Sequence, residues 1–198
     1  MKFKNPFTKA GALLLTSILF INCSDDTETL NESDDTVVAA YTVADFRGSL
    51  SDAEEEQDEA CFSRNLIAGQ NKVVGRVTID VNQDVSWTLT YHTLEGWSLR
   101  ETHLSLSPDC ENPTFPVTKT GNPKVGKFEY AASHEIGIDT VEYTIYQDSF
   151  SWEFCFAAHA VVEGPKGEET AWAEGESFDG KNWAMYVHAF LLGCLQQT

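Results

Sequence analysis

The chain has little positive charge. Its 198 residues include 13 Lys and Arg against 31 Asp and Glu, which gives a formal net charge of −18. Nucleic acids and anionic membrane surfaces attract basic proteins and repel acidic ones, so we expect neither to be a partner. The apolar run at residues 12–21 is also shorter than the roughly 20 residues that a membrane-spanning helix needs.

The sequence lacks the short motifs that mark several common active sites. It contains no G-x-S-x-G nucleophile elbow, no P-loop and no H-E-x-x-H zinc motif. Glu168 with Glu169, and Glu174 with Glu176, are pairs of nearby carboxylates. A glycosidase needs two carboxylates facing each other across a cleft, about 5 to 10 Å apart, and sequence neighbours do not indicate this. We therefore expect no catalytic residues.

The N-terminal 22 residues have the pattern of an export signal. Three lysines precede the apolar run at residues 12–21, and Cys23 follows soon after it. This order of charge and apolar length is typical of a secretory signal peptide. A cysteine in this place resembles the lipobox of bacterial lipoproteins. The resemblance implies that residues 1–22 are removed and that a lipid on Cys23 anchors the mature chain to a membrane, with no other cofactor expected.

Residues 23–60 are predicted to be a flexible acidic linker. The stretch is rich in Asp and Glu and has few apolar positions, so it cannot bury enough surface to fold. Its first acidic run, DDTETLNESDD, resembles the surface-export signal of Bacteroidetes lipoproteins. That resemblance implies an outer-membrane lipoprotein on the extracellular face.

Four cysteines lie in the remaining segment, residues 61–198: Cys61, Cys110, Cys155 and Cys194. An even number in an exported chain favours two disulfides, and three pairings are possible. Pairing of Cys61 with Cys194 would close a loop of nearly the whole domain. Zinc is disfavoured, because these cysteines lack the C-x-x-C spacing that begins a tetrahedral site.

The same segment shows the period-two alternation of β-strands. Apolar side chains alternate at residues 77–81 and 85–91, on either side of an Asn-Gln-Asp turn, which predicts a hairpin. The next strand keeps Leu99, Glu101 and His103 on one face and then shifts its apolar parity, which predicts a bulge.

Residues 108–126 are rich in Pro, Gly and Asn, which predicts a turn-rich surface loop. Strands are expected again at residues 141–145, 150–162 and 183–192. No segment has a helical period with caps. The whole predicts a single antiparallel β-sandwich of the all-β class.

The strand predicted at residues 150–162 contains two candidate functional side chains, a cysteine and a histidine. Its even positions are all apolar and predict a core face, whereas Cys155 and His159 lie on the other face. They are about 13 Å apart along an extended strand, too far for a cysteine–histidine nucleophile. Glu101, His103 and a following loop with Glu169 could join His159, either as metal ligands or as a polar network.

Trp172 and Trp183 flank a glycine-containing loop and are expected to reach solvent, where their rings could stack on sugars. In an alternating strand, however, a tryptophan more often belongs to the core.

Several segments resemble an uncharacterised β-rich extracellular domain found in secreted and surface proteins of bacteria. No activity comes with the resemblance, but it implies that residues 101–103, 158–159 and 169–172 meet in space. At residues 104–110 this chain departs from the aromatic-valine-glycine turn typical of that family. The matching segments are LIAGQNKVVGRVTIDV, WTLTYHTLEGWSLRETHLSLS, GNPKVGKFEY, FAAHAVV, ETAWAEG and GKNWAMYV.

Two functional hypotheses follow. The first is a non-enzymatic surface lipoprotein that serves adhesion or captures a glycan or protein ligand. The alternative is a metal-dependent or glycan-active hydrolase that uses His103, His159 and Glu169.

Overall fold

The computed structural model describes residues 41–48, 60–82, 86–146 and 152–196, and nearly all of their regular structure is antiparallel β-strand. The prediction of an all-β domain is therefore confirmed. The elements are β1 (Tyr41–Phe46), β2 (Phe62–Ala68), β3 (Lys72–Val81), β4 (Trp87–Thr93), β5 (Ser98–Ser107), the 3-10 turn η1 (Val125–Lys127), β6 (Tyr130–Ile138), β7 (Thr140–Ile145), β8 (Glu153–Gly164), β9 (Gly167–Ala173), β10 (Glu176–Ser177), β11 (Met185–Phe190) and the 3-10 turn η2 (Leu192–Gln196).

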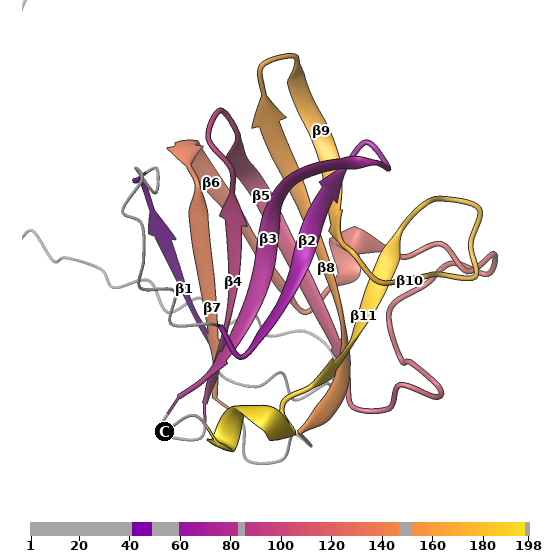
Figure 1. Ribbon diagram of the computed structural model, residues 1–198. Helices are drawn as coiled ribbons and strands as arrows, with labels where there is room; N and C mark the ends of the chain where they lie inside the picture. The colour runs from indigo at the N-terminus through magenta and orange to yellow at the C-terminus, as the bar shows by residue number, and fades with distance from the viewer. Residues whose placement is uncertain (1–40, 49–59, 83–85, 147–151, 197–198) are drawn as a thin grey trace, which may run out of the picture. The chain divides into compact units, whose positions relative to one another are not determined.

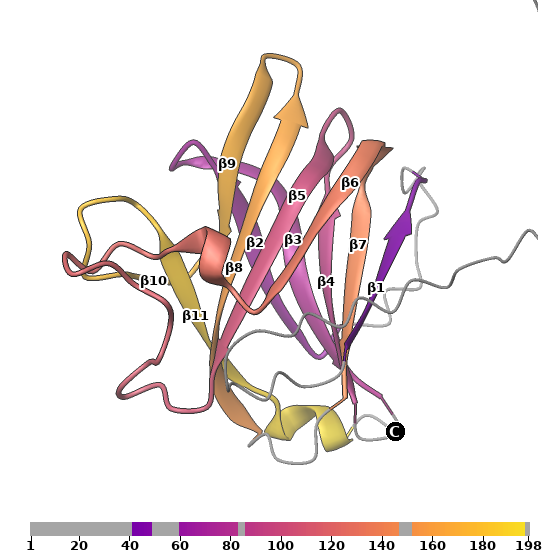
Figure 2. The ribbon, with the colours of Figure 1, turned by 180° about the vertical axis from the view of Figure 1, so that it is seen from behind.

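The strands form one sheet that folds back over itself into a β-sandwich. Its hydrogen-bonded order is β1-β7-β4-β3-β2-β9-β8-β11-β10, and β5 and then β6 follow on the other side of β8. Strand β6 leads into β7 through Asp139, whose backbone bonds to Phe46 and Thr93. Figure 1 shows β2, β3 and β4 in front of β5 and β8, and Figure 2 shows β5, β6 and β8 from behind.

The core lies between these two layers and includes the apolar positions that the alternation predicts in β3, β4, β7 and β8. Leu89 and Tyr91 of β4, and Phe156 of β8, are fully buried in it. Rings meet across the layers: the centroids of Trp87 and Phe154 are 5.0 Å apart. Burial of each large apolar side chain contributes about 1.5 to 3 kcal/mol, so this face of each strand fixes its register.

Strand β8 is buried on its second face as well. Cys155 and Ala157 are fully buried there beneath a second apolar cluster that includes Phe115, Phe128 and Phe178. These aromatic residues come from the segments that precede β6 and follow β9, and Figure 2 shows η1 lying across β8. The loop predicted at residues 108–126 is therefore a cover for the sheet.

The predicted bulge in β5 exists, but it lies earlier than the sequence suggested. Leu99 pairs with Val162 and Glu101 with Val161, so β5 uses two residues where β8 uses one. Leu99 therefore faces the core, while Glu101 and His103 face outward. The prediction that these three share a face is wrong, because the extra residue reverses the alternation at Arg100.

Part of the predicted linker is folded. Tyr41–Phe46 forms β1 and pairs with β7 along its whole length. The Tyr41 ring packs against Tyr130 at 4.8 Å between centroids. The linker prediction is wrong for this stretch, since a strand that joins an existing sheet edge needs only one or two core contacts. The predicted signal peptide, Cys23 and most other linker residues lie outside the described residues.

A chain of hydrogen bonds ties β1 to three other strands. Asp45 Oδ1 lies 3.0 Å from His134 Nδ1, and His134 Nε2 lies 2.7 Å from Thr102 Oγ1. Thr102 Oγ1 lies in turn 2.6 Å from the hydroxyl of Tyr143. The order Asp-His-hydroxyl is also that of nucleophilic triads. Thr102 is fully buried, however, so this chain joins strands and offers no open nucleophile.

Both disulfides form. Cys61 pairs with Cys194, with their Cα atoms 5.2 Å apart, and Cys110 pairs with Cys155, at 5.3 Å. The first joins residues 133 apart in sequence, a closure that the chain-entropy model values at about 5 kcal/mol. The second fastens the cover to the buried face of β8.

Five strands were not predicted from the alternation: β1, β2, β6, β9 and the two-residue β10. Glu169, assigned to a loop, lies instead in β9, which also contains Trp172 and forms a hairpin with β8. Among the described residues, no helix is long and apolar enough to cross a membrane.

Candidate functional site

The predicted histidine pair assembles on the outward face of the sheet. His103 of β5 lies opposite His159 of β8, and His159 lies opposite Trp172 of β9. The Nδ1 atoms of the two histidines are 3.5 Å apart, and the rings of His159 and Trp172 are 4.8 Å apart between centroids. The three segments that the family resemblance groups together thus do lie on neighbouring strands.

The two predicted carboxylates differ in their placement. Glu101 shares the outward face with His103 and is exposed. Glu169 pairs with the core residue Val162 and therefore faces the opposite side of the sheet from His159. Its carboxylate lies over Gly69, where a Cβ atom would come within 2.8 Å of Oε2. The structure does not bring His103, His159 and Glu169 together.

The histidine pair is electrically neutral near neutral pH. Burial, and then the neighbouring His103, lower the pKa of His159 to about 3. Burial also lowers the pKa of His103, against an opposing effect of Glu101. Two neutral imidazoles can share one hydrogen bond, with one ring donating and the other accepting. The arrangement suits a polar link between β5 and β8 that does not include Glu169, which the predicted network did.

The tryptophans are not the exposed pair that the sequence predicts. Trp172 is only 5% exposed and packs against Phe128 and Phe178. Trp183 is partly buried against the same cluster. The prediction for Trp172 is wrong because residues 108–128 and 174–184 cover the outer face, which a sandwich strand often leaves open to water.

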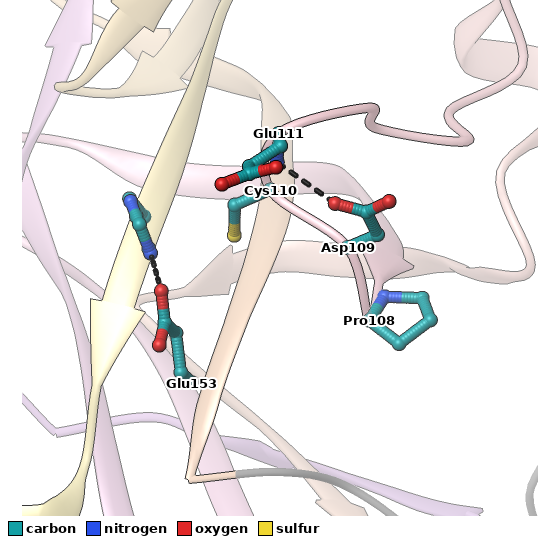
Figure 3. Close-up of a pocket in the computed structure, with 6 residues that line it drawn as sticks. Pro108, Asp109, Cys110, Glu111 and Glu153 are labelled. Carbon is teal, nitrogen blue, oxygen red and sulfur yellow. Dashed lines mark hydrogen bonds and ion pairs between the residues drawn. The ribbon is translucent and has the colours of Figure 1, made fainter.

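An open pocket of about 530 Å³ lies at the edge of this cover, at the start of β8. Its walls come from the loop Pro108–Glu111 and from the facing side chains of Glu153 and His188. Figure 3 shows the Glu111 and Glu153 carboxylates on either side of the Cys110 sulfur. Asp109 accepts hydrogen bonds from the backbone N–H groups of Glu111 and Asn112, which lower its pKa.

Pairing between β8 and β11 positions the floor of this pocket. His188 lies opposite Cys155, and Phe190 lies opposite Glu153. His188 Nε2 is 2.8 Å from Glu153 Oε1, and its ring stacks on Phe190 at 4.2 Å between centroids. Phe190 is 55% exposed, so the site joins carboxylates, an imidazole and an open aromatic face.

Among the described residues, one group of three side chains has metal-ligand spacing: Cys110, Cys155 and His188, whose ligand atoms lie within 4.8 Å of one another. Two of those atoms are the sulfurs of a disulfide, which lack the negative charge of a thiolate ligand. With the disulfide formed, the site therefore offers a metal ion only one imidazole and the nearby carboxylates.

Sequence reasoning missed this pocket. Glu153 and Cys155 do share the odd positions of their strand, and that signal was present. The missing information was the partner of Cys155 and the strand that places His188 beside it. Both depend on long-range pairing, which period-two patterns do not specify.

The buried state of His159 predicts a specific dependence of stability on pH. Its folded pKa lies below the ordinary value of 6.5, so the unfolded chain gains a proton first as the pH falls. Stability is therefore lost between pH 6.5 and about 3, by about 2 to 3 kcal/mol at pH 4.5. Urea unfolding of wild type and His159→Gln at both ends of this range measures the difference. Equal pH dependence in the two proteins would contradict the assignment.

Comparisons with known proteins do not indicate a function for this chain. No protein-family model matches the chain, and no curated protein or solved structure matches it significantly. Membership of the uncharacterised extracellular family stays a prediction, supported by the motifs alone. The geometry of the residues themselves carries the functional proposals that follow.

Proposed function

We propose that the chain is a lipid-anchored binding module displayed at the outer membrane. Four of the five cysteines form two disulfides, which favours an oxidising, exported environment. Cys23 is the one left over, and it stands behind an apolar leader at the position of a lipobox cysteine. A covalent lipid gives this cysteine a role and tethers the domain to a membrane.

The main support for a binding role is the pocket beside Phe190. Carboxylates of Asp109, Glu111 and Glu153 can accept hydrogen bonds from hydroxyl groups, and the exposed ring of Phe190 offers an apolar face. A few polar groups beside an aromatic surface are typical of small-ligand sites. We propose a glycan as the ligand, because sugar rings present hydroxyls at their edges and an apolar face.

The hydrolase hypothesis receives no such support. Burial lowers the pKa of both His103 and His159, and His159 sits beside the buried Trp172. Glu169 lies on the other side of the sheet. A general acid or base must reach the reacting atoms, and a largely buried imidazole does not. We therefore keep the binding role as the proposed function.

Replacement of the lipidated cysteine tests the anchor. Cys23→Ala should abolish incorporation of radiolabelled palmitate and move the protein from the membrane fraction to the soluble fraction. External protease should digest the wild-type protein on intact cells. Palmitate labelling that persists in Cys23→Ala, or membrane fractionation that does not change, would show the anchor to be wrong.

Titration with soluble oligosaccharides tests the pocket. A glycan array first selects the probe, and calorimetry with that oligosaccharide then compares variants. Phe190→Ala and Glu111→Gln should each weaken binding about tenfold, equivalent to about 1.4 kcal/mol. Ile136→Ala is the control, since Ile136 is 72% exposed on β6, away from the pocket. Equal affinity in all variants, or no binding by any glycan, would contradict the proposal.

A further inference from the structure

One of the two disulfides has a histidine within reach. His188 lies directly opposite Cys155 in the β8–β11 pairing, and a ring nitrogen lies within 4.8 Å of both sulfurs of the Cys110–Cys155 bond. An imidazole this close can exchange a proton with a thiol or thiolate after a small side-chain movement. Nothing in the binding role proposed above needs this contact.

Other side chains hold this histidine in place. Glu153 accepts a hydrogen bond from His188 Nε2 at 2.8 Å, and the ring rests on Phe190. A carboxylate in this position stabilises the imidazolium that forms when the ring takes a proton. Imidazole and carboxylate therefore form a supported proton-transfer pair beside the sulfurs.

The two sulfurs differ in access. Cys155 is fully buried, whereas Cys110 is partly exposed on the loop that walls the pocket. Cys110 lines the pocket, and Figure 3 shows its sulfur between the Glu111 and Glu153 side chains. An attacking thiol can therefore reach Cys110, while Cys155 is the sulfur that departs.

The other disulfide is a natural control. Cys61 and Cys194 are both partly exposed, so access alone would make their bond the easier one to attack. Among the described residues, however, no grouping with histidine and metal-ligand spacing includes either of them. Exposure alone predicts that the Cys61–Cys194 bond opens first. The nearby histidine predicts that the Cys110–Cys155 bond opens first.

We infer that the Cys110–Cys155 disulfide is a reactive site at which a small monothiol forms a mixed disulfide with Cys110. The incoming thiol gives its proton to His188, and the resulting thiolate attacks Cys110 Sγ. The bond between the sulfurs breaks, and its electron pair leaves on Cys155 Sγ. Cys155 then takes the proton back from His188, so the products are the mixed disulfide and a free Cys155 thiol.

The site favours both halves of this exchange. Thiolates rather than thiols attack disulfides, and a base beside the bond raises the thiolate fraction where it is needed. A buried leaving thiolate lacks solvation, so proton return from the adjacent imidazole assists its departure. Positioned acid–base groups typically contribute 10²- to 10⁴-fold to rates, so removing one should be readily measured.

Exposure of the oxidised full chain to millimolar glutathione tests the inference. Samples are quenched with acid and N-ethylmaleimide, and peptide mass spectrometry follows each cysteine. Glutathione should appear on Cys110 and N-ethylmaleimide on Cys155 while the Cys61–Cys194 bond is still intact. Equal or faster opening of the Cys61–Cys194 bond would overturn the inference.

Two variants assign the chemistry to the histidine pair. His188→Gln and Glu153→Gln should each slow modification of Cys110 by about tenfold or more. The Glu153 side chain is 51% exposed, so that variant should fold even if His188→Gln does not. Opening of Cys61–Cys194 in the same samples, unchanged by either variant, controls for general loosening. An unchanged rate at Cys110 in both variants would contradict the role of His188.

Discussion

Strand β8 is covered on both of its faces, and the remaining features of the domain depend on this. Its even residues pack into the core between the layers, and its odd residues Cys155 and Ala157 pack beneath an aromatic cover. An apolar outer face exposed to water would be unfavourable, so the segments around η1 and β10 fold over it. The Cys110–Cys155 disulfide fastens that cover to the strand.

The edge of the cover separates two histidine environments on the same face. His159 lies beside Trp172, loses its hydration and becomes a neutral partner of His103. His188 lies beyond the edge, where Glu153 and an open pocket keep it in contact with solvent. His159 is therefore buried and links two strands, whereas the imidazole of His188 can still contact molecules in the pocket. The pocket, the disulfide and the exposed ring of Phe190 meet at this boundary.

The alternation of apolar residues was sufficient to predict the sandwich, the core face of β8 and most strands, because burial on one face imposes a period of two. It could not locate the bulge of β5, since one extra residue at Arg100 reverses the alternation without any compositional sign. It also missed β1, because the acidic composition around Tyr41 predicted a linker and gave no sign of the contact between Tyr41 and Tyr130. The cysteine pairing and the His188 pocket depend on distant strands, so only the assembled sheet shows them.

The most direct test places a charge on the covered face of β8. Ala157 is fully buried on that face, whereas Ala131 is an exposed alanine on β6 and provides the matched control. Urea unfolding should show that Ala157→Glu lowers the free energy of unfolding by more than about 3 kcal/mol, because a carboxylate there is buried without a partner. Ala131→Glu should change it by less than about 0.5 kcal/mol. If Ala157→Glu were tolerated as well as Ala131→Glu, the outer face of β8 would be open to water and the account would be wrong.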